Sequence, residues 1–421
     1  MTATRKNLLI IGNGMTTTRF LEQMIKHGKG GYDISVFGDE PHAGYNRILL
    51  SPLLSGEQQL EDIITHPQDW YRDNDIKLFT QTRINAIDTA AKTVTDASGK
   101  TYPFDALVIA IGSQPYLPDL PGNMLDGVFT YRTIDDVNAM QDLIPGARHA
   151  VVIGGGLLGL EVAHGLNTQG LDVTVCHRGP VLMERQLDII SSGYLQTSLE
   201  SRGIVIRTEA NTVGLAGDGN VNKVILDDGT ELAADIVVFA VGIRPSIELA
   251  MAAGLDCDKG IVVNDQMQGS VPGIAALGEC AQHRGQTYGL VAPLYEQAEV
   301  CARYLCGDNN ASYHGSVLAT SLKVTGIKLF SAGQFNEEKG CQVMQLKDPY
   351  NFLYRKLVFR QRQLVGALLL GDVTAASWYR DLIEAGEVLE HISEQMIYGE
   401  PGASKQVVEP VQDAMADANH A

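Results

Sequence analysis

The chain has 421 residues, of which 45% are hydrophobic, and its formal net charge at pH 7 is −18. This length is too great for one compact core and predicts two or three domains. No apolar run approaches the roughly 18–20 residues that span a bilayer, so we expect no membrane segment. The negative charge repels phosphate, which argues against nucleic acid or an anionic membrane as a partner and is compatible with a locally basic protein partner.

Six cysteines are scattered through the chain without a C-x-x-C pair, which argues against zinc knuckles and iron–sulfur frameworks. We expect reduced, mostly buried thiols and no metal site for this set: Cys176, Cys257, Cys280, Cys301, Cys306 and Cys341. At the N-terminus, Arg5 and Lys6 run directly into an apolar stretch, without the separate apolar segment and cleavage site of a secretory signal. We therefore expect a cytoplasmic protein.

A strand–helix–strand pattern occurs twice along the chain. The first copy comprises an apolar run, a glycine turn, a helical pattern and a second strand-like run: residues 8–11, Gly12-Asn13-Gly14, 15–27 and 34–37. The second copy repeats this order at residues 150–153, Gly154-Gly155-Gly156, 157–168 and 173–176. Two further apolar strands, 106–111 and 236–241, end in Gly112 and Gly242 and are expected to close the two units.

The pattern changes from about residue 313, where alternating strands such as 356–359 and 364–370 precede a helix near 374–384. We expect an α/β protein with two Rossmann-like dinucleotide-binding domains and a small α+β C-terminal domain. The expected boundaries are residues 1–119 with 246–312 for a discontinuous first domain, 120–245 for the second, 313–395 for the third, and 396–421 for a polar, disordered tail.

The glycine turns carry the clearest chemical signal. A diphosphate binds against backbone N–H groups at a helix N-terminus, where a Cβ atom would block its approach and the helix dipole favours negative charge. The second turn has the full G-x-G-x-x-G spacing at Gly154, Gly156 and Gly159. The first has Gly12 and Gly14 but Thr17 in the third place, which predicts a slightly displaced helix and a retained phosphate site. One such motif is weak evidence, but two in full context indicate two nucleotides.

The end of the second strand in each unit indicates which nucleotide binds there. A carboxylate at this point binds a free ribose 2′-hydroxyl, whereas basic residues accept a 2′-phosphate. The first unit offers Asp39 and Glu40, which suits the adenosine ribose of FAD. The second offers His177 and Arg178 and no acid, which predicts a preference for NADPH over NADH, unless both side chains merely face solvent.

Gly278-Glu279 follows an apolar stretch after the second unit. A carboxylate at the start of a helix can hold the ribityl hydroxyls of a flavin. Taken alone, Glu279 is better explained as an acid at a helix N-terminus, which the helix dipole favours. Its position after the second dinucleotide unit shifts the balance toward the flavin role.

These residues resemble a known family, the flavoprotein disulfide-reductase superfamily with two dinucleotide domains. More narrowly, the chain resembles the FAD/NAD(P)H module of assimilatory nitrite reductase large subunits and the electron-transfer subunits of assimilatory nitrate reductase. The resemblance covers roughly residues 7–385, and the stretches that carry it are 10–15, 45–47 with 50–51, 110–113, 129–133, 154–161, 278–281 and 289–293.

The resemblance implies site roles that spacing alone does not. Arg47 and Arg132 are expected at the FAD diphosphate and adenine side, Ile84 at the adenine, and Glu279 at the ribityl chain. Glu161 is expected beside the nicotinamide and isoalloxazine rings as the catalytic residue, with a helix-dipole acid as its alternative reading.

The resemblance also implies the reaction. It predicts an NAD(P)H-dependent FAD oxidoreductase that passes electrons to a separate acceptor protein, most simply a nitrate or nitrite reductase component, since the chain shows no cysteine-rich segment for iron–sulfur and sirohaem groups. A rubredoxin or ferredoxin acceptor, and a non-catalytic flavin-binding regulator, stay open, as does a homodimer. A thiol enzyme is disfavoured because the first cysteine is Cys176.

Overall fold

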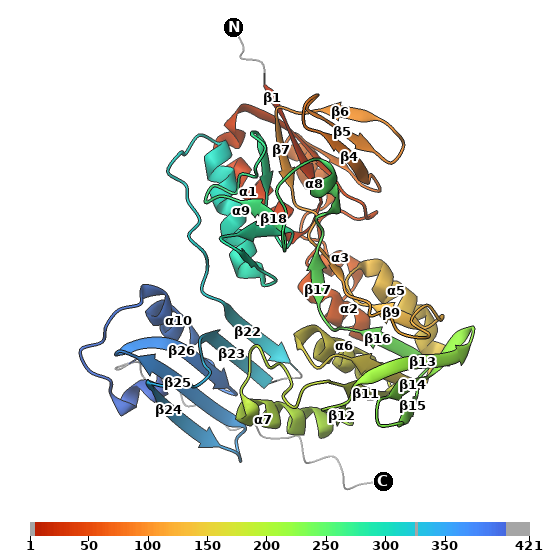
Figure 1. Cartoon of the computed structure of the whole chain (residues 1–421), viewed down its shortest axis with the longest axis vertical. Coiled ribbons are helices and arrows are strands. Elements are labelled where there is room, and N and C mark those ends of the chain that lie inside the picture. Colours follow the sequence, from red (N-terminus) through yellow and green to blue (C-terminus); the bar gives the residue numbers. More distant parts are fainter. Residues whose placement is uncertain (1–4, 325–326, 401–421) are drawn as a thin grey trace. The chain divides into compact units, whose positions relative to one another are not determined.

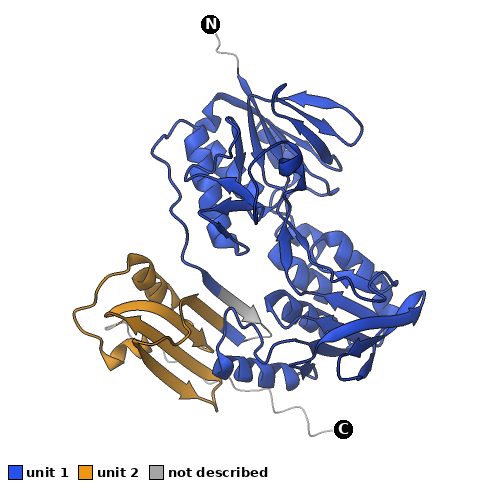
Figure 2. Ribbon diagram, viewed as in Figure 1, with its two compact units in different colours: residues 1–328 blue, residues 329–421 orange. Residues whose placement is uncertain are grey.

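The computed structural model describes residues 5–324 and 327–400 of the chain. The chain forms two compact units, residues 1–328 and 329–421, shown in separate colours in Figure 2. Within the described residues, no helix is both long and apolar enough to cross a membrane.

The first sheet of unit 1 is parallel throughout and has the strand order β19-β7-β1-β2-β3. Its strands are β1 (Lys6–Ile11), β2 (Tyr32–Phe37), β3 (Ile76–Phe79), β7 (Ala106–Ile109) and β19 (Ile274–Ala276). All four residues of β7 are buried, as expected of a strand covered on both faces. Helices α1 (Met15–Lys26) and α9 (Val291–Leu305) pack against each other beside this sheet (Figure 1).

The second sheet of unit 1 repeats this plan, with parallel strands in the order β12-β11-β10-β16-β9. Its strands are β9 (Val128–Thr130), β10 (His149–Ile153), β11 (Asp172–Cys176), β12 (Val205–Arg207) and β16 (Ile236–Phe239). The accompanying helices are α5 (Ile134–Leu143), α6 (Leu157–Thr168) and α7 (Ile189–Glu200). The strand before each glycine turn, β1 or β10, is central in its sheet, so each turn lies at the carboxyl edge, where α/β proteins bind ligands.

The chain crosses between the two dinucleotide-binding sheets in two extended segments. These are β8 (Ser113–Pro115) and β17 (Ile243–Pro245), which pair antiparallel. Because β19 follows the second sheet in the sequence but belongs to the first, the first sheet is assembled from discontinuous parts of the chain.

Smaller elements complete unit 1. Three-stranded sheets are formed by β4 (Ile84–Asp88), β5 (Thr93–Asp96) and β6 (Thr101–Pro103); by β13 (Thr212–Asp218), β14 (Asn220–Leu226) and β15 (Glu231–Ala233); and by β18 (Ile261–Val263), β20 (Ala281–His283) and β21 (Gln286–Thr287). The short helices are α2 (Leu50–Ser55), α3 (Leu60–Ile63), α4 (Gln68–Asp73) and α8 (Glu248–Ala252), with 3₁₀ turns η1 (Gly28–Gly31), η2 (Arg47–Leu49) and η3 (Ile144–Gly146).

The C-terminal part of the chain forms a sheet in the order β22-β23-β26-β25-β24. The bounds are β22 (Ala319–Val324), β23 (Ile327–Gly333), β24 (Cys341–Asp348), β25 (Leu353–Arg360) and β26 (Gln363–Leu370), followed by α10 (Ala376–Ala385) and the 3₁₀ turn η4 (Glu394–Tyr398). Pairing among β23 to β26 is antiparallel. The inner strands β25 and β26 are buried along most of their length.

The last described residues of the chain overlap the start of the tail expected at residues 396–421. Met396 and Ile397 are buried in η4. The backbone carbonyl of Met396 accepts a hydrogen bond from the Tyr379 hydroxyl at 2.6 Å, and that of Ile397 accepts one from the Arg355 guanidinium at 2.9 Å. Two buried side-chain donors therefore hold this segment on the domain, and the rest of the expected tail from residue 401 lies outside the described residues.

The predicted α/β architecture is confirmed, with two parallel sheets and a separate antiparallel C-terminal sheet. The closing strands are shorter than expected: β7 ends at Ile109 and β16 at Phe239, two residues earlier in each case than the apolar runs suggested. The expected domain boundaries stay predictions.

Candidate functional site

The first glycine turn follows β1 and opens α1. Gly12 has φ +104°, and a Cβ atom on it would overlap the Ala110 carbonyl. Gly14 is the N-cap of α1, and a Cβ atom there would meet nothing within 4 Å. The buried Thr17 donates its hydroxyl to the Gly12 carbonyl at 2.9 Å. The turn therefore has a closed side toward the sheet and an open side at the helix N-terminus.

The second turn, after β10, has the same form. Gly154 has φ +119° and lies against the Ala240 carbonyl, and Gly156 caps α6 with open space where a Cβ atom would stand. A Cβ atom on Gly159 would overlap the Gly154 carbonyl. Thr17 carries a side chain at the matching place of the first turn, and its hydroxyl is bonded to the Gly12 carbonyl; the displacement of α1 expected from Thr17 stays a prediction.

The two open faces fit the diphosphate of a dinucleotide, since helix-terminal N–H groups point there without a side chain in the way. Polar atoms near the first turn add to this fit. Asn13 Nδ2 and Gln297 Nε2 are buried without a hydrogen-bond partner in the described part of the chain. Gln297 Oε1 accepts the Gly278 N–H at 3.0 Å. Buried polar atoms without a partner are rare and mark places where a ligand or water completes the hydrogen bonding.

Four predicted residues form one charged network near the first turn. The Arg47 guanidinium binds the Glu40 carboxylate and donates to the Arg132 carbonyl at 2.6 Å. Burial opposes the charge on Arg47, but the neighbouring Tyr45 and Glu40 outweigh it and raise the pKa of Arg47. The Arg132 guanidinium in turn binds the Glu279 carboxylate. Two cations are thus neutralised by two anions.

Glu279 is held from a second side by the Ser113 hydroxyl, which donates to Oε2 at 2.8 Å. Gly112 lies beside this pair, because a Cβ atom on it would stand 3.3 Å from Arg132 Nη2 and 3.6 Å from Glu279 Oε2. Gly278, with φ +87°, sets the turn that brings Glu279 to this place. The residues predicted around the flavin side of the site are therefore brought together.

Two predicted residues lie outside this network. Asp39 is exposed, and its carboxylate lies 3.4 Å from the Arg83 guanidinium, a long contact that leaves it accessible to a ligand. Ile84 begins β4 and is buried in the core of the first domain.

Glu161 lies on the first turns of α6, and Ser51 on α2 donates its hydroxyl to Glu161 Oε2 at 3.5 Å. The Tyr131 hydroxyl donates to Ser51 Oγ at 3.3 Å. Burial raises the pKa of Glu161 to about 7, while the hydrogen bond from Ser51 acts in the opposite direction. Helix α2 also packs on α6, where Leu54 fills the space beside Gly165. This contact joins the first glycine-turn domain to the second.

The two residues predicted to bind a 2′-phosphate, His177 and Arg178, differ in whether their side chains are free to contact a ligand. His177 follows β11, and both of its ring nitrogens bind the chain itself: Nδ1 the Gly155 N–H at 3.1 Å and Nε2 the Val181 carbonyl at 3.0 Å. Arg178 is exposed and forms no ion pair with any described residue. Gly242 has φ +126°, and its carbonyl accepts the Tyr116 N–H at 2.9 Å beside β17.

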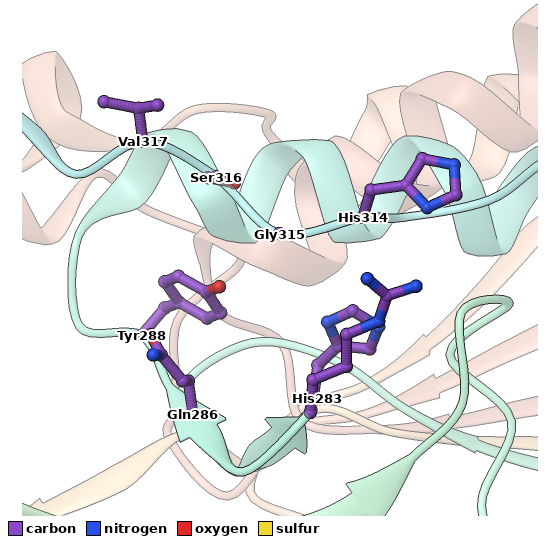
Figure 3. Close-up of a pocket in the computed structure, with 8 residues that line it drawn as sticks. His283, Gln286, Tyr288, His314, Gly315, Ser316 and Val317 are labelled. Carbon is purple, nitrogen blue, oxygen red and sulfur yellow. The ribbon is translucent and has the colours of Figure 1, made fainter. Parts of the chain in front are cut away.

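A separate hollow of about 430 Å³ lies elsewhere on unit 1 (Figure 3). It is lined by His283, Arg284, Gln286, Tyr288, His314, Gly315, Ser316 and Val317. None of the predicted site residues lines it. In residues 5–324 and 327–400, no cluster of three or more histidine, cysteine or acidic side chains could hold a metal ion.

Sequence reasoning missed several residues that shape the site. Ser51, Ser113 and Tyr131 lie in stretches that carry the resemblance, but no role was assigned to them. Gln297 was missed altogether, although a glutamine among apolar residues of a helix is a signal that could have found it. Hydroxyl groups gave no such signal, since their partners are distant in the sequence.

Comparison with known proteins shows the family to which the chain belongs. The family model of pyridine nucleotide-disulphide oxidoreductases matches residues 6–301, and that of the rubredoxin NAD+ reductase C-terminal domain matches residues 319–387. A nitrite reductase [NAD(P)H] of Bacillus subtilis is 45% identical over 87% of this chain and 46% of its own length. An assimilatory nitrate reductase electron transfer subunit of the same organism is 41% identical over 87% of this chain and 48% of its own length. The chain thus spans about half the length of these relatives.

Solved structures show the same fold over nearly the whole chain. A ferredoxin reductase from Rhodopseudomonas palustris has a TM-score of 0.85 and 27% identity, covering 93% of this chain and 97% of its own. An NADH:rubredoxin oxidoreductase from Clostridium acetobutylicum has a TM-score of 0.76 and 26% identity, covering 92% and 97%.

Proposed function

The chain belongs to the pyridine nucleotide-disulphide oxidoreductase family, and we propose that it is a cytoplasmic NAD(P)H-dependent reductase component of assimilatory nitrate or nitrite reduction. It is an oxidoreductase with FAD and NAD(P)H as cofactors. The proposal adds the direction of electron flow: from the nicotinamide dinucleotide, through the flavin, to a separate acceptor protein.

The observation that carries the proposal is the contact of α2 with α6 through Ser51 and Glu161. Each glycine turn fits one dinucleotide, and this contact joins the two domains at the N-terminal end of α6. A nicotinamide ring reaching from the second turn and a flavin ring reaching from the first would meet beside it.

When bound, the two cofactors supply the redox chemistry itself, a hydride passing from the nicotinamide to the flavin and electrons then leaving singly. The chain binds and orients them. We assign the FAD side to Gly12, Gly14 and Asp39, with Arg47, Arg132 and Glu279 in the network that borders it. We assign the nicotinamide dinucleotide to Gly154, Gly156 and Gly159.

Glu161 is the residue we place beside the reacting rings. Because its pKa is raised to about 7, its carboxyl can be either protonated or charged at neutral pH. A protonated carboxyl can donate a hydrogen bond as well as accept one. Ser51 donates to this carboxyl and in turn accepts a hydrogen bond from Tyr131, and Pro52 in the next position supplies no cation.

We further propose that NADPH is preferred to NADH. Arg178 follows β11, is exposed and forms no ion pair with another residue that the structure describes, and a guanidinium matches the geometry of a phosphate group. The His177 ring is already bound within the chain, so the 2′-phosphate role first given to both residues passes to Arg178 alone.

The electron acceptor is proposed from the relatives, two of which are named as nitrite reductase and as an electron transfer subunit of assimilatory nitrate reductase. A rubredoxin or ferredoxin is the second candidate, because residues 319–387 match the C-terminal domain of rubredoxin NAD+ reductase.

The test is an anaerobic titration of the purified flavoprotein. NADPH should bleach the visible flavin absorption, and addition of an oxidised molybdenum nitrate reductase should restore it faster than an equal amount of rubredoxin or ferredoxin. If NADPH and NADH both leave the flavin oxidised, the reductase role is wrong and a non-catalytic flavin-binding protein is supported. If only rubredoxin or ferredoxin restores the absorption, the second candidate replaces the first.

A further inference from the structure

The loop that follows β11 is fastened to the middle residue of the second glycine turn. The Gly155 N–H donates to His177 Nδ1 at 3.1 Å, and the Gly155 carbonyl accepts the Met183 N–H at 2.9 Å. Met183 adopts φ +51°, a left-handed conformation that non-glycine residues rarely take. Such strain persists only where the surroundings fix it, and here the loop closes onto Gly155 from both ends.

These contacts fix the protonation pattern of the His177 ring. A backbone N–H can only donate, so Nδ1 must carry a lone pair, and a backbone carbonyl can only accept, so Nε2 must carry the proton that points to the Val181 oxygen at 3.0 Å. Both bonds exist together only for the neutral imidazole with its proton on Nε2. The imidazole ring thus links the glycine turn to the loop after β11 through one hydrogen bond on each side.

The packing supports the same view. A Cβ atom on Gly155 would stand 2.9 Å from His177 Cγ and 2.5 Å from Leu182 Cδ2, so the imidazole occupies the space that a side chain at Gly155 would need.

In the first glycine turn the side chain and the glycine exchange places. The backbone register is the same, because Gly12 N–H donates to the Phe37 carbonyl and Gly154 N–H to the Cys176 carbonyl, both at 2.8 Å. In the first turn the residue after the strand is Gly38, and a Cβ atom on it would stand 3.1 Å from Asn13 Cβ. Each turn therefore has room for one side chain between its middle residue and the residue that follows the second strand. In the first turn this side chain is Asn13, from the turn itself, and in the second it is His177, from the residue after β11.

We propose that His177 is a positioning residue for the nicotinamide dinucleotide: its neutral imidazole holds the Gly155 peptide and so keeps the open face at Gly156 and the start of α6 aimed at the diphosphate. The inference rests on the assignment of the second turn to that dinucleotide. It differs from the role of Arg178, because the diphosphate is common to NADP+ and NAD+ whereas the 2′-phosphate is not. Loss of the His177 contact should weaken both dinucleotides equally.

Two substitutions separate the two ring nitrogens. In His177→Asn, the side-chain oxygen takes the place of Nδ1 and can still accept the Gly155 N–H. In His177→Gln, the amide reaches the place of Nε2 and leaves the Gly155 N–H without an acceptor. Calorimetric titration of the full-length, FAD-loaded protein with NADP+ and with NAD+ gives the binding constants. We expect His177→Asn to bind within about threefold of wild type and His177→Gln to bind both about tenfold more weakly, as for an unsatisfied buried donor.

A second readout requires no nucleotide. Hydrogen–deuterium exchange over residues 150–160 should accelerate at Gly155 in His177→Gln and stay near wild type in His177→Asn. The visible flavin spectrum of each variant confirms that the first site is intact. In turnover, His177→Gln should raise KM for the dinucleotide with kcat at saturation unchanged.

The inference is overturned if the two variants behave alike, or if His177→Gln weakens NADP+ and leaves NAD+ unchanged, which would place the ring at the 2′-phosphate. If wild type binds neither dinucleotide, the proposed function fails instead, and the exchange rates at Gly155 alone decide whether the contact to His177 exists.

Discussion

At the scale of single residues, Arg178 gives the sharpest test of cofactor choice. It is exposed and unpaired within the described residues at the end of β11, so its removal breaks no contact of the fold. A charge-assisted bond from a guanidinium to a phosphate is worth roughly 1.5–3 kcal/mol, which corresponds to a factor of about ten or more. Arg178→Ala should therefore raise the KM for NADPH about tenfold and leave that for NADH unchanged.

NADH serves as the internal control for this variant, because the two dinucleotides differ only in the 2′-phosphate. Equal loss for NADPH and NADH would show that Arg178 acts on the shape of the site. No change for either would mean that the 2′-phosphate lies elsewhere.

The Glu161 carboxyl predicts a pH dependence of stability. Burial raises its pKa to about 7 in the folded protein, whereas an unfolded glutamate titrates near ~4.3. The folded state thus binds the Glu161 proton more tightly than the unfolded state does. The stabilisation that this carboxyl gives the folded protein therefore falls as pH rises from ~4.3 through about 7. Wild type should lose stability relative to Glu161→Gln over this window, by on the order of 2 kcal/mol.

Urea unfolding of both proteins at about pH 5 and about pH 8.5 measures this difference. The stability of Glu161→Gln relative to wild type should be greater at the higher pH than at the lower. Glu184→Gln, at an exposed glutamate on the loop after β11, is the control and should show no such divergence. A difference between wild type and Glu161→Gln that is the same at both pH values would contradict the burial argument.

Residues with local signals could be predicted from the sequence, and those with distant partners could not. Gly12 and Gly154 were found because a strand, a turn and a helix follow each other in the chain. Arg132 was assigned only through resemblance, since its partner Glu279 is 147 positions away. The part of His177 in the glycine turn could not be seen either, because the contact depends on the space above Gly155.

At the scale of elements, hydrophobic periodicity and turn residues predict the strands and helices of both dinucleotide units to within a few residues. Helix α1 was expected at 15–27 and spans Met15–Lys26, and α6 ends at Thr168 as expected. The closing strands end two residues before their apolar runs do, at Ile109 and Phe239. The next residue in each, Ala110 or Ala240, still donates its N–H to the last residue of the central strand, after which Gly112 and Gly242 turn the chain away with positive φ angles. Helix α2, whose packing on α6 brings the two domains together, had no periodic signal in its six residues.

The fit of α6 on its glycine turn predicts the effect of one added methyl group. A Cβ atom on Gly159 would overlap the Gly154 carbonyl, so Gly159→Ala must push the first turn of α6 away from the turn. The N–H groups that face the diphosphate move with it. We expect dinucleotide affinity to fall at least about tenfold, in line with the sensitivity of close-packed contacts, while the flavin stays bound.

Gly193→Ala in α7 is the matched control, because a Cβ atom there meets nothing within 4 Å. Alanine replaces glycine in a helix interior, which should stabilise the protein by roughly 0.5–1 kcal/mol and leave dinucleotide binding unchanged. Calorimetric titration and thermal unfolding of the two variants give both quantities. Unaltered affinity in Gly159→Ala would show that α6 can shift without moving the diphosphate site.

At the scale of the whole molecule, the kinds of sheet could be anticipated from the sequence. Repetition of the strand–helix–strand pattern predicts two parallel sheets, and the discontinuous first domain expected from the sequence agrees with the position of β19 in the first sheet. The packing of η4 against the C-terminal domain was not foreseen, because it depends on the buried donors Arg355 and Tyr379.

The net charge of −18 predicts how electron delivery responds to salt. A protein of this charge attracts cationic acceptors and repels anionic ones over a distance set by the Debye length, about 10 Å at 0.1 M salt. With a basic c-type cytochrome as acceptor, the second-order rate of reoxidation of the reduced flavoprotein should fall as salt rises from about 10 mM to about 300 mM. With ferricyanide, which is anionic, the same rise should accelerate reoxidation, because repulsion is screened. Stopped-flow absorbance of the flavin under anaerobic conditions measures both rates with one enzyme preparation. If both acceptors respond to salt in the same direction, then a local patch at the electron exit, rather than the charge of the whole molecule, controls the encounter.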